Sequence, residues 1–239
     1  MSDTIETERD WGRYFADAVS RVGPKEFLAQ VGYTINGQAI EPAQIELIAQ
    51  AIRQGLAIGP SDIVLDLCCG NGLVTHRIAA VAQRIYGVDF SHELIEVARR
   101  HFSGVNLAYV CRPVTELTAA DLGGDRITKA YMAAALQHFT RQSVGTLMEI
   151  IRTLSGASAP IYFTDVPDVA HLFDFYNTPE RRAEYERRRA AGTEAIGTWW
   201  NKKDLAELIT QSGYEAIIVP QNPARFGAHY RFDLLARPR

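Results

Sequence analysis

From residue 62 onward, short apolar segments alternate with amphipathic ones along the chain. The apolar segments predict strands at 63–67, 84–88, 107–110, 127–133, 160–164, 215–219 and 230–236. Helical spacing of apolar residues predicts helices at 73–82, 92–102, 142–154 and 203–211. This order predicts an α/β fold with a doubly wound, mostly parallel sheet of seven strands. No helix separates the last two strands, so we expect a hairpin and one antiparallel C-terminal strand.

The first 60 residues follow helical periodicity instead. Helices are predicted at 6–22, 24–31 and 41–56, and the turn-rich "GYTINGQA" at 32–39 separates the last two. No strand is predicted in this part. A second unusual segment, at 167–200, is longer than most connections in such folds. Insertions at the carboxyl edge of a sheet lie above its ligand crevice, so we expect a helical insertion over the active site.

Composition limits the possible classes of protein. The chain has 239 residues, is 47% hydrophobic and carries a formal net charge of −3, which fits a soluble α/β domain. No apolar run approaches the roughly 18 residues of a membrane span, and "MSDTIETERDW" is unlike a signal peptide. We therefore expect a cytoplasmic protein without a membrane partner. Cys68, Cys69 and Cys111 lack metal-binding spacing, so free thiols and no metal site are expected.

The stretch "DIVLDLCCGNGLVTHRIA" at 62–79 runs an apolar strand into a glycine loop and then directly into a helix. This is the pattern of the first turn of a parallel α/β sheet, where small residues let a ligand lie against the main chain. A dinucleotide site needs a third glycine, but Thr75 occupies its place. A nicotinamide-dependent oxidoreductase therefore becomes a minor alternative.

Two aspartates flank this loop in the sequence. Asp66 lies within the apolar strand, where a buried carboxylate needs partners such as the loop amides and a bound ammonium group. The alternative is a core carboxylate satisfied by the protein itself. Asp89 ends the second strand about 20 residues further on, where a carboxylate can accept both hydroxyls of a ribose. Asp89 could instead cap the next helix, but Ser91 is the better candidate for that role.

These residues resemble the glycine-rich motif of class I S-adenosylmethionine-dependent methyltransferases. Asp66 matches the family's acidic residue, Gly70 and Gly72 match two of its glycines, and Cys68 stands at its first glycine. The resemblance covers residues 62–164 by motif and reaches the C-terminus by the order of strands and helices. It implies a Rossmann-like sheet and S-adenosyl-L-methionine as the cofactor.

Further site residues follow from the same resemblance. Phe90 would cover the adenine, and the Val114 amide would contact its edge, since Arg112-Pro113-Val114 replaces the usual Gly-Asp-Ala. In "YMAAALQHF", Ala133 would lie beside the methionine end of the cofactor. His138 would reach the substrate as a general base that titrates near pH 6.5, or would serve only in packing. The candidates for binding the acceptor are Tyr14, Tyr33, Asp165 and Tyr176.

The resemblance implies methyl transfer to a small-molecule acceptor, with a hydroxyl group preferred over an amine. A cofactor-binding protein without transferase activity is the alternative from another class. Five arginines at 181–189 could clamp an anionic acceptor, or could form a solvated helix face balanced by glutamates. The chain lacks the basic excess and the aromatic-basic array of nucleic-acid enzymes, so no nucleic-acid partner is expected. Either a monomer or a homodimer is compatible with the sequence.

The expected organisation is a single methyltransferase domain over residues 1–239. It comprises an N-terminal helical cap (1–60), a cofactor-binding half (61–166), the helical insertion or lid (167–200), and a C-terminal helix with the closing hairpin (201–239). No internal repeat, low-complexity tract or linker interrupts this arrangement.

Overall fold

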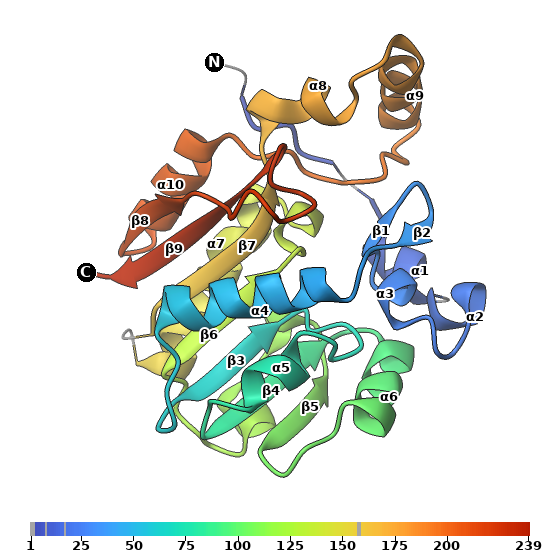
Figure 1. Cartoon of the computed structure of the whole chain (residues 1–239). Coiled ribbons are helices and arrows are strands. Elements are labelled where there is room, and N and C mark those ends of the chain that lie inside the picture. The colour runs from blue at the N-terminus through green and yellow to red at the C-terminus, as the bar shows by residue number, and fades with distance from the viewer. Residues whose placement is uncertain (1–2, 8, 17, 157–158) are drawn as a thin grey trace.

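A seven-stranded sheet forms the centre of the molecule. The computed structural model describes residues 3–7, 9–16, 18–156 and 159–239. The strands are β3 (Ile63–Leu67), β4 (Arg84–Asp89), β5 (Leu107–Cys111), β6 (Lys129–Ala133), β7 (Ile161–Pro167), β8 (Tyr214–Val219) and β9 (Arg231–Pro238). Their spatial order is β5-β4-β3-β6-β7-β9-β8 (Figure 1). The predicted fold class and number of strands are confirmed.

The direction of the strands also follows the prediction. β3 pairs in parallel with β4 and β6, and the parallel pairing continues outward to β5 and β7. β9 is antiparallel to both of its neighbours, β7 and β8. Since β8 and β9 follow each other without an intervening helix, they can only pair in this sense. The C-terminal strand is therefore the antiparallel one.

Helices cover both faces of the sheet (Figure 1). On one face, α4 (Ala43–Leu56) and α5 (Thr75–Ala79) pack against one apolar cluster, and on the other face α7 (Arg141–Ser155) and α10 (Lys202–Gln211) pack against a second. The α7 helix buries Val144, Leu147 and Ile151, which share a face at helical spacing. Its two ends are defined by Thr140, whose side chain accepts from Ser143 N, and by a left-handed Gly156.

The N-terminal part differs from its prediction in two places. It contains α1 (Trp11–Ala16), α2 (Ala18–Val22), α3 (Phe27–Gln30) and a short antiparallel hairpin, β1 (Thr34–Ile35) with β2 (Gln38–Ala39). The absence of strands was thus predicted wrongly. Asn36 and Gly37 both have positive φ, 51° and 78°, as a tight two-residue hairpin turn requires. Residues 6, 7, 9 and 10 are not helical, and positions 8 and 17 of the predicted 6–22 helix lie outside the described residues.

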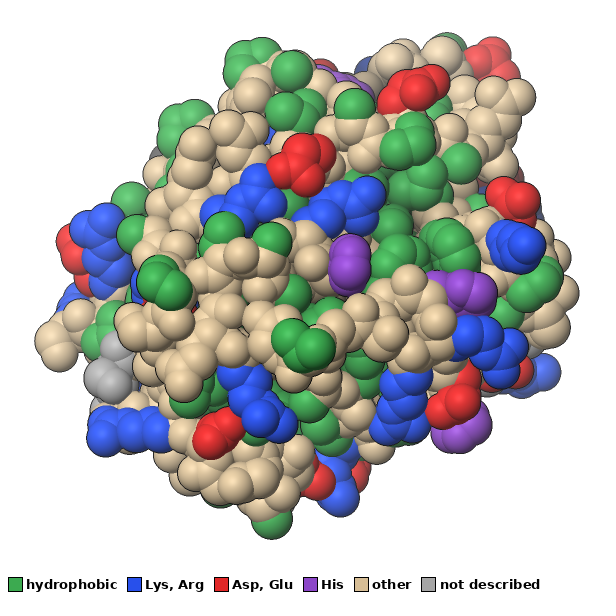
Figure 2. Space-filling view, turned by 60° about the horizontal axis from the view of Figure 1, so that its bottom comes forward, with side chains coloured by type: hydrophobic (Ala, Val, Ile, Leu, Met, Phe, Trp, Pro, Cys, Tyr) green, Lys and Arg blue, Asp and Glu red, His purple; other side chains and the backbone are tan. Residues whose placement is uncertain are grey.

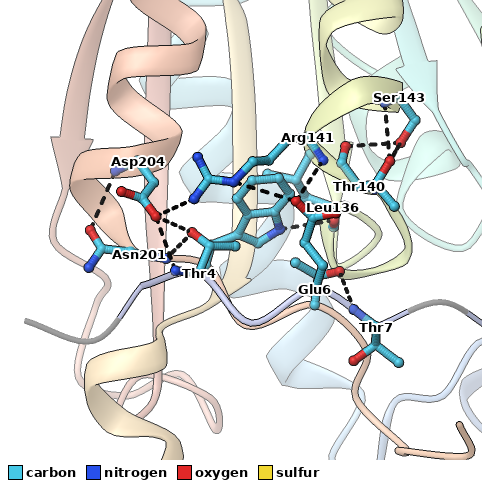
Figure 3. A network of polar contacts seen from close by, with 11 residues as sticks. Thr4, Glu6, Thr7, Leu136, Thr140, Arg141, Ser143, Asn201 and Asp204 are labelled. Atoms are coloured by element: carbon cyan, nitrogen blue, oxygen red, sulfur yellow. Dashed lines mark hydrogen bonds and ion pairs between the residues drawn. The ribbon is translucent and has the colours of Figure 1, made fainter.

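Residues 3–7 and 9–10 form an N-terminal strap across the C-terminal half of the chain. Ile5 pairs with Trp199 through two main-chain hydrogen bonds of 2.8 and 2.9 Å. Thr4 donates to Asp204 Oδ2 from its amide at 3.0 Å and from its hydroxyl at 2.8 Å. Arg141 also contacts Asp204, and it reaches Glu6 at 3.4 Å (Figure 3). These contacts explain why the strap is extended and why the first helix begins only at Trp11.

The insertion packs on the strap. It contains a 3-10 turn at Val169–His171, α8 (Leu172–Phe175) and α9 (Pro179–Ala190), which lie together at one end of the molecule (Figure 1). Its apolar side chains form a separate cluster that includes Ile5 of the strap, Trp199 and Tyr230. The buried Glu194 accepts hydrogen bonds from the Tyr176 hydroxyl and the Gly197 amide. The insertion therefore has its own small core.

The surface carries charges of both signs. Lys and Arg side chains alternate with Asp and Glu over the face shown in Figure 2, with hydrophobic side chains scattered between them. This distribution agrees with the small net charge of −3. Among the described helices, none has the length and apolar character needed to cross a membrane.

Candidate functional site

A cavity lies at the carboxyl ends of β3, β4 and β6. Its empty volume, including the open space at its mouth, is about 1040 Å³. The helices α1 to α3 lie at this edge of the sheet (Figure 1), and Trp11, Phe15 and Val31 from this part complete the wall. Nine predicted site residues line the cavity, namely Tyr33, Asp66, Cys68, Gly70, Asp89, Phe90, Val114, Ala133 and His138.

The glycine loop after β3 is held in a conformation that needs small residues. Gly70 and Gly72 have φ values of 56° and 79°, in the left-handed region. A Cβ atom on Gly72 would lie 2.5 Å from the Tyr109 hydroxyl oxygen. Cys68 also has a positive φ, 61°, which strains a residue that is not glycine. The loop therefore keeps its main chain close to the cavity.

Asp89 connects this loop to the end of β4. Its Oδ2 accepts from the Gly70 amide at 2.9 Å, and its Oδ1 accepts from the Ser91 amide at 2.9 Å. Burial raises the pKa of Asp89, and the donated amide hydrogen bonds oppose that rise. Each carboxylate oxygen keeps a further lone pair for a ligand hydroxyl. Ser91, as predicted, caps the following helix α6 (His92–His101) by accepting from Leu94 N.

Asp66 has different partners from those predicted. Its Oδ2 accepts from the Thr75 hydroxyl at 2.7 Å and from the Tyr131 hydroxyl at 2.6 Å, where the sequence suggested the loop amides. Burial raises the pKa of the Asp66 carboxyl to about 7, against these two hydrogen bonds. A cationic group placed beside it would favour the charged form and lower that pKa. Asp66 is therefore suited to respond to the charge of a ligand.

His138 lies in a 3-10 turn after β6, at Leu136–His138, with its ring against two aromatic rings. The ring centroids are 4.0 Å from Trp11 and 5.4 Å from Phe15. Burial, and then the positive charges of Arg231 and Arg9, lower the pKa of His138 to about 3. The imidazole is therefore neutral near pH 7 and is a weak base. Its environment does not support the predicted titration near pH 6.5.

Four predicted site residues lie outside the cavity wall. Gly72 packs behind the loop against Tyr109, and Asp165 is buried in an ion pair with Arg225 at 2.6 Å. The Tyr14 ring packs against two guanidinium groups, those of Arg9 and Arg21, at 4.2 and 4.9 Å. Tyr176 belongs to the core of the insertion, where its hydroxyl binds Glu194. The structure does not bring these side chains to His138.

The insertion does not form the cavity wall. Among the described residues, none between 167 and 200 lines the cavity, although Gly197 packs closely on Trp11. Arg187 and Arg188 pair with Glu184 on the exposed side of α9. This arrangement matches the solvated helix face rather than an anion clamp. The part of the chain that the structure describes also has no cluster of metal-binding side chains.

Sequence reasoning missed several wall residues, above all Trp11, Phe15 and Phe139. Trp11 and Phe15 share one face of α1 at a spacing of four residues, which is equally typical of a helix that packs on a core. Nothing in the local sequence distinguishes these two roles, because the wall is completed by contacts between distant segments.

Comparisons with known proteins agree with this geometry. Residues 64–156 match the model of a family described as "Methyltransferase domain". The Ubiquinone biosynthesis O-methyltransferase of Bordetella pertussis is 36% identical over 159 residues, covering 64% of this chain and 61% of that protein. The chain spans 37 to 43% of the length of the first curated relatives that it matches.

Solved structures show the same fold. A SAM-dependent methyltransferase from Anabaena variabilis superposes with a TM-score of 0.65 at 16% identity, covering 100% of this chain and 99% of that one. The magnesium protoporphyrin IX methyltransferase of Synechocystis, solved with bound SAH, gives a TM-score of 0.59 at 14% identity, covering 96% and 95% of the two chains. Residues 64–156 therefore form a methyltransferase domain, within a chain that has the same overall fold as solved S-adenosylmethionine-dependent methyltransferases.

Proposed function

We propose that this chain transfers a methyl group from S-adenosylmethionine to a hydroxyl oxygen of a small-molecule acceptor. The observation that carries the proposal is the junction of the glycine loop with Asp89 at the cavity. There one carboxylate both holds the Gly70 amide and lines the space open to a ligand. The match of residues 64–156 to the methyltransferase domain model supports the choice of cofactor.

The residues around the cavity fit this cofactor. Asp89 would accept from the ribose hydroxyls, Phe90 and Val114 would contact the adenine, and Asp66 would face the ammonium group. S-adenosylmethionine supplies a methyl group on a sulfonium, whose C–S electron pair stays on sulfur when the acceptor oxygen forms the new C–O bond. The protein contributes mainly by aligning the reactants and excluding water.

His138 is the proposed proton acceptor. Its neutral imidazole lines the same cavity as the glycine loop and Asp89. It would take the proton of the acceptor hydroxyl as the new C–O bond forms and release it to solvent afterwards. A small-amine acceptor is the runner-up, and the name of the Bordetella relative, an O-methyltransferase, supports oxygen.

A transfer assay tests the proposal. The protein is incubated with S-adenosylmethionine carrying an isotopic methyl label and a panel of small alcohols, phenols and amines, and S-adenosylhomocysteine release is measured. We expect label on an oxygen atom of at least one acceptor, located by mass spectrometry. Asp89→Ala serves as the control with impaired cofactor binding. Label found only on amines would overturn the O-directed proposal, and tight cofactor binding without any transfer would favour the non-enzymatic alternative.

A further inference from the structure

A buried ion network lies at the carboxyl end of β7. Arg225 pairs with Asp165 Oδ1 at 2.6 Å and with Asp233 Oδ2 at 2.8 Å, and the three side chains are each 1% exposed. These three residues do not line the cavity. Buried ion pairs lose much of their Coulombic attraction to desolvation and often add little net stability. The network is therefore better explained by the geometry that it imposes than by added stability.

The network holds two neighbouring strand ends in strained conformations. Asp165 has a φ of 61°, and Ala134, which directly follows β6 and lines the cavity, has a φ of 51°. The Asp165 amide donates to Asp233 Oδ1, and the Ala134 amide donates to the Thr164 carbonyl, both at 3.0 Å. Arg225 also donates to the Thr164 hydroxyl at 2.8 Å. Residues other than glycine keep such conformations only where their surroundings impose them, often at functional sites.

Arg231, at the start of β9, links this end of β7 to the turn that carries His138. Its Nη1 donates to the Asp165 carbonyl and also to Gln137 Oε1, the latter at 2.8 Å. Gln137 is buried and directly precedes His138 in the turn Leu136–His138. One guanidinium group thus bridges the segments that end β6 and β7, which are adjacent strands.

The main chain of the same turn is held from another side. The Thr198 amide donates to the Gln137 carbonyl at 2.7 Å, and the Trp200 indole donates to the Leu136 carbonyl at 3.1 Å. Together with the side-chain bond from the guanidinium group, these contacts fix both residues that precede His138. Because His138 lines the cavity, a displacement of this turn would change the cavity wall.

The charge of Arg231 also acts on the imidazole. After burial, this positive charge is the largest cause of the lowered pKa of His138. Arg231 itself does not line the cavity. Its influence on a bound ligand is therefore indirect, through the position and the surroundings of His138.

We infer that Arg231 is a positioning residue, which fixes the His138 turn against the strained end of β7 through its bridge to Gln137. The inference rests on the proposed function, in which His138 acts on the acceptor. A small displacement of an aligned group can slow a reaction greatly while a ligand held by other residues still binds. Loss of the bridge should therefore lower kcat and leave cofactor affinity nearly unchanged.

Two matched glutamine variants test the inference. Gln137→Met removes the acceptor of the bridge and keeps a side chain of similar length beside Arg231. Gln44→Met is the control, because Gln44 bonds the Phe226 amide at 2.9 Å and the Ala224 carbonyl at 3.0 Å and does not line the cavity. Both variants lose side-chain hydrogen bonds of a glutamine, but only Gln137→Met breaks the bridge.

Kinetics and calorimetry give the first readout. The turnover number is measured with the acceptor that receives label in the transfer assay, and the Kd is measured for S-adenosylhomocysteine. Gln137→Met should lower kcat about 10- to 100-fold and leave the Kd within about twofold. Gln44→Met should leave both values within about twofold.

NMR of histidine-labelled protein gives a readout that does not depend on activity. The His138 ring signal, assigned by its absence in His138→Ala, is sensitive to the Trp11 ring, whose centroid is 4.0 Å away. It should shift in Gln137→Met and keep its position in Gln44→Met.

The double variant Gln137→Met with Arg231→Met tests whether Arg231 acts through Gln137. Its kcat should be no lower than that of Arg231→Met alone, because both substitutions remove the same bridge. Losses of kcat that multiply in the double variant would show that Arg231 acts by another route and would overturn the inference. A parent-like kcat or an unmoved His138 signal in Gln137→Met, or equal losses in the two glutamine variants, would also overturn it. If the parent protein methylates no acceptor, the proposed function fails, and the His138 signal alone then decides whether the bridge fixes the turn.

Discussion

Asp89 is the residue whose replacement should weaken cofactor binding most selectively. In Asp89→Ala the ligand loses the carboxylate that we place at its ribose, while the strand that carries the residue remains paired on both sides. The Gly70 amide also loses its acceptor, so the glycine loop loses its link to the end of β4. Both effects act on the cofactor half of the cavity.

The size of the effect follows from the contacts. A hydrogen bond to a charged group contributes about 1.5–3 kcal/mol, and each 1.4 kcal/mol changes an equilibrium constant about tenfold. We therefore expect the Kd for S-adenosylhomocysteine to rise roughly 10- to 150-fold in Asp89→Ala. The variant should remain folded, since the carboxylate has no partner in the apolar core.

Calorimetric titration of the parent and variant measures this change, with Ser91→Ala as the matched control. Ser91 caps α6 through a hydrogen bond from Leu94 N and does not line the cavity. Its replacement should cost about 1 kcal/mol of stability and leave the Kd within about twofold. If Asp89→Ala bound as tightly as the parent, Asp89 would serve only to hold the loop. If Ser91→Ala lost affinity equally, the effect would reflect stability and not ribose recognition.

Three other perturbations test the remaining parts of the site. The affinity for S-adenosylhomocysteine should increase as pH rises through about 7, where the buried Asp66 ionises, because the charged carboxylate attracts the ligand ammonium. Titration of Asp66→Asn across the same pH range should show no such increase in affinity. A parent affinity that does not change with pH would refute the assignment. His138→Ala should slow transfer about 100-fold with little change in cofactor affinity. The pKa of about 3 predicts that the rate of the parent protein shows no histidine titration near pH 6.5. A decrease in the transfer rate of less than about tenfold would assign His138 to packing. Asp204→Asn loosens the strap at Thr4 and Arg141, and should raise the KM for the acceptor about three- to tenfold at unchanged cofactor affinity. Glu207→Gln on the same helix is the control. Equal KM values in the parent and in Asp204→Asn would show that the strap does not position Trp11.

Features set by neighbouring residues could be predicted from the sequence. The glycine loop, Asp89 at the end of its strand and the Ser91 cap lie within short segments, and each has a local signal in glycine spacing, strand periodicity or capping preference. The β1–β2 hairpin had such a signal too, since Asn36-Gly37 favours a two-residue turn, but it was interpreted as a break between helices.

Features set by distant residues could not be predicted in this way. Tyr131 reaches Asp66 because the register of β3 and β6 places the two residues opposite each other. Trp11 reaches His138 only because the strap is bound along the segment before α10. Both contacts depend on how separate elements pack, and the local pattern of apolar residues does not encode that packing.

Titration of S-adenosylhomocysteine into the parent protein tests the central claim most directly. The Kd should be in the micromolar range, about −8 kcal/mol, with one ligand bound per chain and no comparable heat from NADH. Tight binding of NADH together with no response to S-adenosylhomocysteine would contradict the account.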